Sequence, residues 1–209
     1  MEFEWFLIIV SFLITHVTVT RYVIKRGQSH YESVQGNGKQ PVEPFWDIIG
    51  SNTPDLSRYN YTKNVFLLVF IVPLMYGIVV SKDQVRRKIL REFGMKLAIL
   101  IFLRALTIGT TIFPKTPSCK PFEGRREILN YFVGGGCYDK MFSGHMSFGV
   151  LASLICWKHK LLPNTLFGGS LLVLLNLLHL ITLGATRSHF TVDLVVAIYI
   201  TGAVFYTIP

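Results

Sequence analysis

Residues 137–145 read Cys-Tyr-Asp-Lys-Met-Phe-Ser-Gly-His, and the chain is organised around this stretch. It leaves a polar loop and enters an apolar segment through Ser143 and Gly144, with His145 just inside that segment. A helix that starts here presents unpaired backbone N–H groups and the positive end of its dipole, which together suit a phosphate group. His145 would give or take a proton beside that phosphate.

A second motif, Ser-His-Phe-Thr-Val-Asp at residues 188–193, supports this interpretation, because Ser-Gly-His alone recurs by chance. On a helix, His189 and Asp193 are four residues apart and lie on one face. The Asp193 carboxylate would orient the imidazole through one ring nitrogen and leave the other free to attack phosphorus. His145, His189 and Asp193 are therefore the candidate catalytic residues.

The composition indicates a membrane protein. Of the 209 residues, 51% are apolar, and the mean hydropathy is +0.45, which is high for a soluble domain. The net charge of +9 does not indicate a nucleic-acid partner, because the basic residues lie in loops between long apolar runs, where they contact lipid headgroups. The first apolar run is predicted to be an anchor rather than a cleavable signal. We expect a single domain over residues 1–209.

The fold class predicted from these runs is all-α, a polytopic bundle of six transmembrane helices. The predicted spans are at about residues 3–23, 64–80, 95–113, 142–157, 164–183 and 189–208. Residues 45–49 are expected to form an interfacial amphipathic piece. Residues 82–91, with five basic side chains in ten, are expected to be a loop on anionic lipid.

Six spans place His145 and His189 at the same membrane face, as a joint active site requires. Which face this is stays open. The loops on one side carry eight Lys and Arg residues and those on the other side carry twelve, but the latter are longer, and loop length weakens the charge rule.

Arg104, His16 and His179 also lie within predicted spans. Arg104 near the middle of the third span costs at least ~2.5 kcal/mol unless it is partnered. Either it pairs with a carboxylate or with helix-end carbonyls, or it clamps a headgroup or phosphate, and both alternatives stay open. His16 is expected to be packed or interfacial, and His179 to be a hydrogen-bonded interior histidine.

Several motifs occur in the order and spacing of one known family. They are Cys137-x-Asp139-x3-Ser143-Gly144-His145, His189-Phe190-Thr191-x-Asp193, the series Arg104, Thr107, Thr111 and Pro114, and the short Pro54-Asp55. Together they resemble the sphingomyelin synthase branch of the lipid phosphatase/phosphotransferase superfamily. Tyr138, Met146 and Phe190 replace residues usual in that branch. These replacements are expected to affect the preference for headgroup and acceptor more than the phosphotransfer reaction itself. The patterns of the general phosphatase branch are absent from the sequence.

The resemblance implies a ping-pong transfer. His189 would attack the phosphorus of a phospholipid, and His145 would protonate the departing diacylglycerol and then deprotonate a ceramide or diacylglycerol-like acceptor. Ser143, Gly144 and Arg104 would hold the phosphoryl oxygens, and Asp139 would orient groups or relay protons. No metal or other cofactor is expected.

Phosphocholine is the headgroup that the resemblance favours. The enzyme alternatives are a lipid phosphate phosphatase and a phosphatidylcholine:diacylglycerol cholinephosphotransferase, and the non-enzyme alternative is a catalytically silent scaffold or transporter.

The resemblance places the protein in the Golgi, the endoplasmic reticulum or the plasma membrane, with a lumenal or exoplasmic site. Cys119 and Cys137 would then share an oxidising compartment, as a pair or as free thiols. Homo-oligomerisation stays open.

Overall fold

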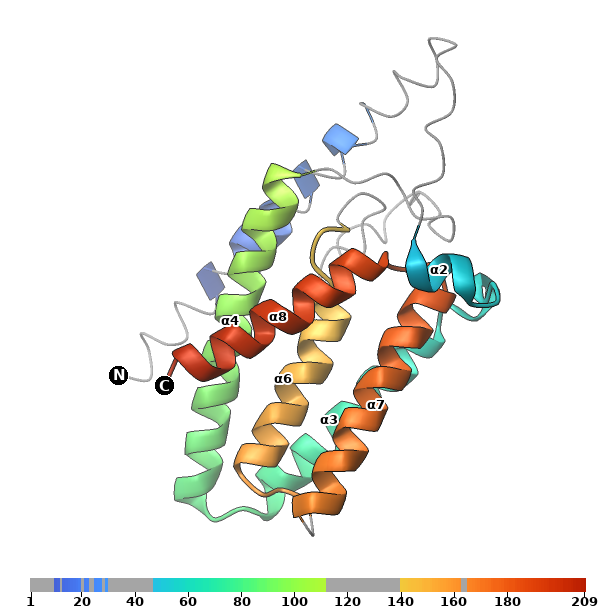
Figure 1. The fold of residues 1–209 in the computed structure, drawn as a ribbon. Helices are drawn as coiled ribbons and strands as arrows, with labels where there is room; N and C mark the ends of the chain where they lie inside the picture. The colour runs from blue at the N-terminus through green and yellow to red at the C-terminus, as the bar shows by residue number, and fades with distance from the viewer. Residues whose placement is uncertain are drawn as a thin grey trace, which may run out of the picture.

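In the computed structural model, the described residues are 47–111, 140–162 and 165–209, together with separate residues between 10 and 29. Within them the regular structure is helical, which confirms the predicted all-α class (Figure 1). The elements are α2 (Ile48–Asn52), the short 3-10 helix η1 (Ser57–Tyr59), α3 (Thr62–Val80), α4 (Asp83–Thr110), α6 (Gly144–Lys158), α7 (Thr165–Ala185) and α8 (Thr191–Thr207).

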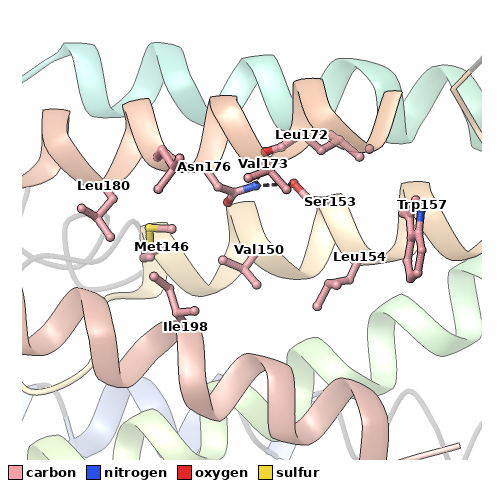
Figure 2. A pocket seen from close by; sticks show the side chains of 12 residues that line it. Met146, Val150, Ser153, Leu154, Trp157, Leu172, Val173, Asn176, Leu180 and Ile198 are labelled. Carbon is pink, nitrogen blue, oxygen red and sulfur yellow. Dashed lines mark hydrogen bonds between the residues drawn. The ribbon is translucent and has the colours of Figure 1, made fainter. Parts of the chain in front are cut away.

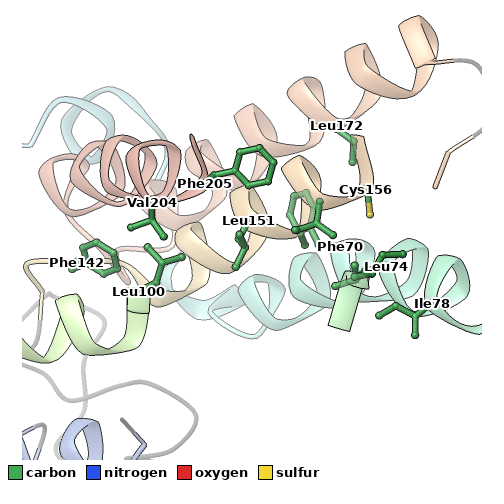
Figure 3. Close-up of a cluster of buried hydrophobic side chains, with 13 residues drawn as sticks. Phe70, Leu74, Ile78, Leu100, Phe142, Leu151, Cys156, Leu172, Val204 and Phe205 are labelled. Carbon is green, nitrogen blue, oxygen red and sulfur yellow. The ribbon is translucent and has the colours of Figure 1, made fainter. Parts of the chain in front are cut away.

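Helix α6 is the centre of the bundle and packs against α3, α4, α7 and α8. Figure 1 shows α8 crossing α6 and α4 at a slant, whereas α3 and α7 run alongside α6. The apolar core joins all of them through Phe70, Leu100, Leu151 and Phe205 (Figure 3). Such packing fixes α6 against four neighbours, so both ends of α6 are held in place.

The membrane assignment rests on helix length and outward-facing apolar side chains. In the described part of the chain, α3, α4 and α7 are long and apolar enough to cross a membrane, and α8 is a shorter apolar helix. Large apolar side chains such as Tyr76, Leu166 and Tyr199 are exposed, which suits a surface facing lipid. The predicted span at residues 3–23 is described only in part, with its described residues helical, so the count of six spans stays a prediction.

The expectation that residues 82–91 form a loop is wrong. Helix α4 begins at Asp83, so this basic stretch is the first part of a 28-residue helix. Its Lys, Arg, Gln and Leu residues are good helix formers, and Asp83 in the first turn suits the helix dipole and pairs with Arg86. Hydropathy indicates where a helix enters the lipid, not where the helix begins. For this reason the polar first part of α4 was predicted to be a loop.

Candidate active site

His145 lies in the first turn of α6, as the sequence predicts. Ser143 is the N-cap: its backbone is extended, and its Oγ accepts a hydrogen bond from the backbone N–H of Met146 at 3.2 Å. An N-cap serine satisfies one of the first N–H groups of a helix and fixes where the helix starts. The Ser-Gly-His sequence therefore encodes the helix start that holds His145 at the end of the bundle.

His189 is held against Asp193, although not in the way that the sequence predicts. It precedes the N-cap Phe190 and so lies just outside α8 rather than on it. Its Nδ1 is still 3.0 Å from Oδ2 of Asp193, which also accepts the backbone N–H of Phe190 at 3.1 Å. Asp193 therefore orients the imidazole and holds the first turn of α8 together.

The two histidines come from segments 44 positions apart in the sequence and meet in space. Their ring centroids are 6.0 Å apart, and both side chains are buried. A backbone hydrogen bond of 3.3 Å from Ser143 N–H to the Asp193 carbonyl ties the starts of α6 and α8 together. His145 Nε2 also lies 3.4 Å from Asn64 Oδ1 on α3. The predicted joint location of the two imidazoles is thus what the structure has.

Arg104 reaches the same end of the bundle from α4. Its Nε donates to the backbone carbonyl of Phe142 at 3.0 Å, and its guanidinium lies next to the ring of His16. Of the two alternatives from the sequence, the partnering of a helix-end carbonyl is therefore present. A contact with phosphate remains a prediction.

Positive charge is concentrated around the histidine pair. Lys63, Lys140 and Arg104 are each close enough to both imidazoles to act on them electrostatically. Neither lysine was among the candidate site residues predicted from the sequence. Lys63 could have been found, because it directly precedes the predicted second span, at the membrane face assigned to the histidines. Lys140 could have been found because it lies between Asp139 and Ser143 of the family motif.

The segment around α2 holds the start of α8 in place, which the sequence also did not indicate. Asp47 Oδ1 accepts the backbone N–H of Thr191 at 2.5 Å, and Thr191 Oγ1 accepts that of Ile49 at 3.0 Å. These reciprocal hydrogen bonds lie two residues from His189. The expected interfacial piece at residues 45–49 is thus, in its described part, packed on the bundle; Phe45 and Trp46 lie outside the described residues.

Arg187 completes this connection from the turn between α7 and α8. Its φ of 53° is in the left-handed region, which is uncommon for a residue other than glycine. Its guanidinium donates to the Thr53 carbonyl at 2.9 Å and to the Gly184 carbonyl at 3.3 Å. These bonds hold the strained turn that places His189, two residues further on.

Asp55 of the weak Pro54-Asp55 match caps a surface turn. Its Oδ1 accepts the backbone N–H of Ser57 at 2.8 Å. This hydrogen bond holds the pKa of the Asp55 carboxyl below its ordinary value. The residue is exposed and belongs to the segment that follows α2 rather than to the histidine pair.

Five residues singled out from the sequence lie outside the described residues: Pro114, Cys119, Cys137, Tyr138 and Asp139. The free cysteine in the described part of the chain is Cys156, buried in the core. Among the residues that the structure describes, no group of three or more His, Cys, Asp or Glu side chains has an arrangement that would hold a metal ion.

An oriented histidine that faces a second histidine beside three cations defines a site suited to phosphoryl groups. Residues 136–209 match the family model described as PAP2 superfamily C-terminal, and this segment contains Ser143, His145, His189 and Asp193. This match confirms the resemblance of the C-terminal part of the chain to the PAP2 superfamily.

One curated relative comes from Trypanosoma cruzi (strain CL Brener) and is described as a phosphatidylinositol:ceramide inositolphosphotransferase. It is 32% identical over 126 residues, which are 56% of this chain. The match spans 37% of the length of that relative.

Proposed function

We propose that this protein transfers a phospho-headgroup from a phospholipid to ceramide or a similar lipid alcohol and releases diacylglycerol. One observation carries the proposal: His189, hydrogen-bonded to Asp193, faces His145 at a ring-centroid distance of 6.0 Å within an apolar helix bundle. Two imidazoles at this separation can both reach one phosphoryl group, one at phosphorus and the other at an oxygen bonded to it.

In the first half-reaction, His189 is the nucleophile. An ionised carboxylate only accepts hydrogen bonds, so Nδ1–H of His189 donates to Asp193 and Nε2 keeps its lone pair. Nε2 attacks phosphorus, a phosphorus–nitrogen bond forms, and the phosphorus–oxygen bond to diacylglycerol breaks. Protonated His145 gives its proton to the departing oxygen, a transfer that contributes ~10²–10⁴ in rate.

In the second half-reaction, His145 is the general base. It accepts the proton of the acceptor hydroxyl, whose oxygen attacks phosphorus while the phosphorus–nitrogen bond breaks. His189 is restored, and His145 is again protonated for the next cycle. The burial of both rings supports transfer to a lipid hydroxyl, because little water reaches them.

The anionic phosphoryl group needs positive partners at this site. Lys63, Lys140 and Arg104 supply that field, and the first backbone N–H groups of α6, after Ser143 and Gly144, suit phosphoryl oxygens. Asp139, in the adjoining loop, is proposed to orient groups or relay protons, as the family motif suggests.

An apolar cavity next to the site supports a lipid substrate. It has a volume of about 430 Å³ and lies between α6, α7 and α8 (Figure 2). It begins at Met146, directly after His145, and extends along α6 to Trp157. Eleven residues of helix span about 16 Å, which is long enough for much of an acyl chain.

The headgroup is the least constrained part of the proposal. The motifs of the sequence favour phosphocholine, whereas the name of the Trypanosoma cruzi relative favours phosphoinositol. We therefore propose transfer of one of these two headgroups. Tyr138, Met146 and Phe190 stand where the sphingomyelin synthase motifs have other residues, and these differences fit a change in headgroup preference.

We further propose that the histidine end of the bundle faces a lumen or the cell exterior, in an endomembrane or the plasma membrane. The basic start of α4, residues 82–91, lies at the opposite end of the helices from His145. Lys and Arg residues concentrate on the cytoplasmic side of membrane proteins. This charge supports an exoplasmic site.

The test is to incubate the purified protein with labelled ceramide and a panel of phospholipids that includes phosphatidylcholine and phosphatidylinositol. Mass spectrometry should identify one ceramide phospho-headgroup product together with diacylglycerol. His189→Ala should abolish both products. Release of the free phospho-headgroup without a ceramide product would instead indicate a phosphatase, and lipid turnover unchanged in His189→Ala would exclude His189 as the nucleophile.

A further inference from the structure

His179 on α7 is a buried histidine that the proposed chemistry does not use. Its side chain is fully buried, yet neither ring nitrogen has a hydrogen-bond partner among the described residues. The expectation of a hydrogen-bonded interior histidine is therefore wrong. Buried polar atoms almost always have a partner, because an unsatisfied one destabilises the fold. A histidine kept at such a position calls for a reason other than packing.

The position of His179 relates it to the active site. The ring lies against Gly149 of α6, where a Cβ would come within 3.2 Å of Nδ1 of His179. Gly149 is four residues after His145, so the two lie one turn apart on the same face of α6. The imidazoles of His179 and His145 are close enough to interact electrostatically. His179 thus lies one helical turn deeper in the bundle than the reacting centre.

Two phenylalanines of α3 enclose the ring. Phe66 stacks on it nearly parallel, with centroids 5.4 Å apart, and Phe70 lies at 5.5 Å. Phe70 is fully buried, whereas Phe66 is only partly buried. Phe66 is therefore the less buried of the two rings that cover His179.

We propose that His179 binds the polar linkage of the acceptor lipid, the amide and free hydroxyl of a ceramide-type molecule; this rests on the proposed transfer. These groups lie within a few bonds of the reacting hydroxyl, so they fall about one helical turn below the phosphorus when the hydroxyl is beside His145. A neutral imidazole offers one donor and one acceptor. The amide and hydroxyl of ceramide both donate and accept, whereas the ester linkages of diacylglycerol only accept.

His179 thereby becomes a specificity-determining residue. Ceramide satisfies both ring nitrogens, and a diacylglycerol acceptor leaves one of them unpaired. A site that hydrogen-bonds a substrate group discriminates strongly against an analogue without it, because the buried polar atoms of the site then lack partners. The wild-type protein should therefore prefer ceramide over diacylglycerol as acceptor.

The experiment compares acceptors in His179→Phe, a variant that keeps an aromatic ring between Phe66 and Phe70 but has no ring nitrogen. Its kcat/KM for ceramide should fall by about 10–100-fold, the effect of losing one or two hydrogen bonds. Its kcat/KM for diacylglycerol, and for a ceramide analogue without the free hydroxyl or amide N–H, should change by less than about threefold, because the one hydrogen bond lost is offset by removal of the ring nitrogen that these acceptors leave unpaired. Equal losses for all acceptors, or unchanged ceramide turnover, would overturn the proposal.

Two further variants separate binding from packing. Phe70→Leu disturbs the same cluster and leaves both nitrogens in place, so it should lower the Tm without changing the ratio of ceramide to diacylglycerol turnover. His179→Gln keeps a donor and an acceptor and should restore part of that ratio. The Tm of His179→Phe without lipid should equal or exceed that of the wild type, because an unsatisfied polar group is removed.

A binding measurement distinguishes failure of this inference from failure of the proposed function. Ceramide in mixed micelles should raise the Tm of the wild type and of His189→Ala, and this rise should be lost in His179→Phe. If the wild type transfers no headgroup but shows this pattern, His179 still binds the lipid linkage and the transfer proposal is wrong. An identical rise in all three proteins contradicts the role of His179, whatever the turnover.

Discussion

The two ends of the central helix α6 both carry clusters of buried charged or titratable side chains, but the clusters differ in how they are partnered. At the far end, Glu92 of α4 accepts hydrogen bonds from Lys96 at 2.6 Å, Lys158 at 2.7 Å and His159 at 3.0 Å. Lys96, which is fully buried, also donates to the Phe205 carbonyl at 3.0 Å. This cluster joins α4, α6 and α8 through contacts made within the chain.

At the histidine end, one buried acceptor atom has no partner in the described part of the chain. Lys63, Lys140 and Arg104 act electrostatically on the two imidazoles, and Oδ1 of the buried Asp193 carboxylate has no hydrogen-bond partner among the described residues. A buried polar atom without a partner costs free energy unless a ligand or water satisfies it. The comparison supports a structural role for the Glu92 cluster and fits the proposed binding of a lipid substrate at the histidine cluster.

The largest expected effect comes from the same carboxylate-to-amide change at each end. Asp193→Asn should lower kcat by ~10⁴-fold, because an amide that donates to Nδ1 imposes the wrong tautomer on His189. Glu92→Gln is the matched control and should leave kcat of the folded protein within a few-fold of the wild type. Headgroup-transfer assays check both variants. Similar losses at the two ends would contradict the distinction between them.

The second prediction concerns stability at the far end. Glu92→Ala leaves Lys96 buried without its carboxylate and should lower the free energy of unfolding by about 3–5 kcal/mol. The double variant Glu92→Leu, Lys96→Met replaces the pair by apolar groups of similar size and should recover most of this loss. Thermal unfolding in detergent measures both. A tolerated single variant would show that the cluster contributes little to the fold.

The third prediction tests how the histidine end is held. Asp47→Ala removes the acceptor for the backbone N–H groups of Thr191 and Gly50, and should cost about 0.5–2 kcal/mol of stability, as for other helix caps. Thr191 is two residues from His189, so the loss of this hydrogen bond should displace the His189 imidazole. The fold-decrease in kcat should therefore be larger than the fold-change in KM. Asp47→Asn keeps an acceptor oxygen and serves as the control. Loss of stability with unchanged kcat would limit Asp47 to a structural role.

The smallest expected effect is at the N-cap of α6. Ser143→Ala should cost about 1 kcal/mol, whereas Ser143→Gly should cost only a few tenths, as cap substitutions do. If Ser143 also holds a phosphoryl oxygen, both variants should lose activity to the same extent despite their different stabilities. Activity that simply follows stability would restrict Ser143 to capping.

Local patterns were sufficient where the relevant contact is local. The start of α6 near Gly144 and the pairing of His189 with Asp193 depend on residues within four positions of each other, so spacing predicted both. The extent of α4 was missed because hydropathy reports the lipid boundary and not helix propensity. The Asp47–Thr191 contact joins residues 144 positions apart, and no local pattern indicates it.

That apolar helices carry two histidines and an aspartate in the motifs of the PAP2 superfamily follows from residue order alone, because hydropathy and cap chemistry are properties of neighbouring residues. Which charged groups meet follows only from the packing of the helices. This packing brings Lys63, Lys140 and Arg104 to the histidines, gives Glu92 three partners, and leaves the ring nitrogens of His179 without a hydrogen-bond partner among the described residues. Such pairings depend on the angles at which helices cross, and these are set by the packing of the whole core.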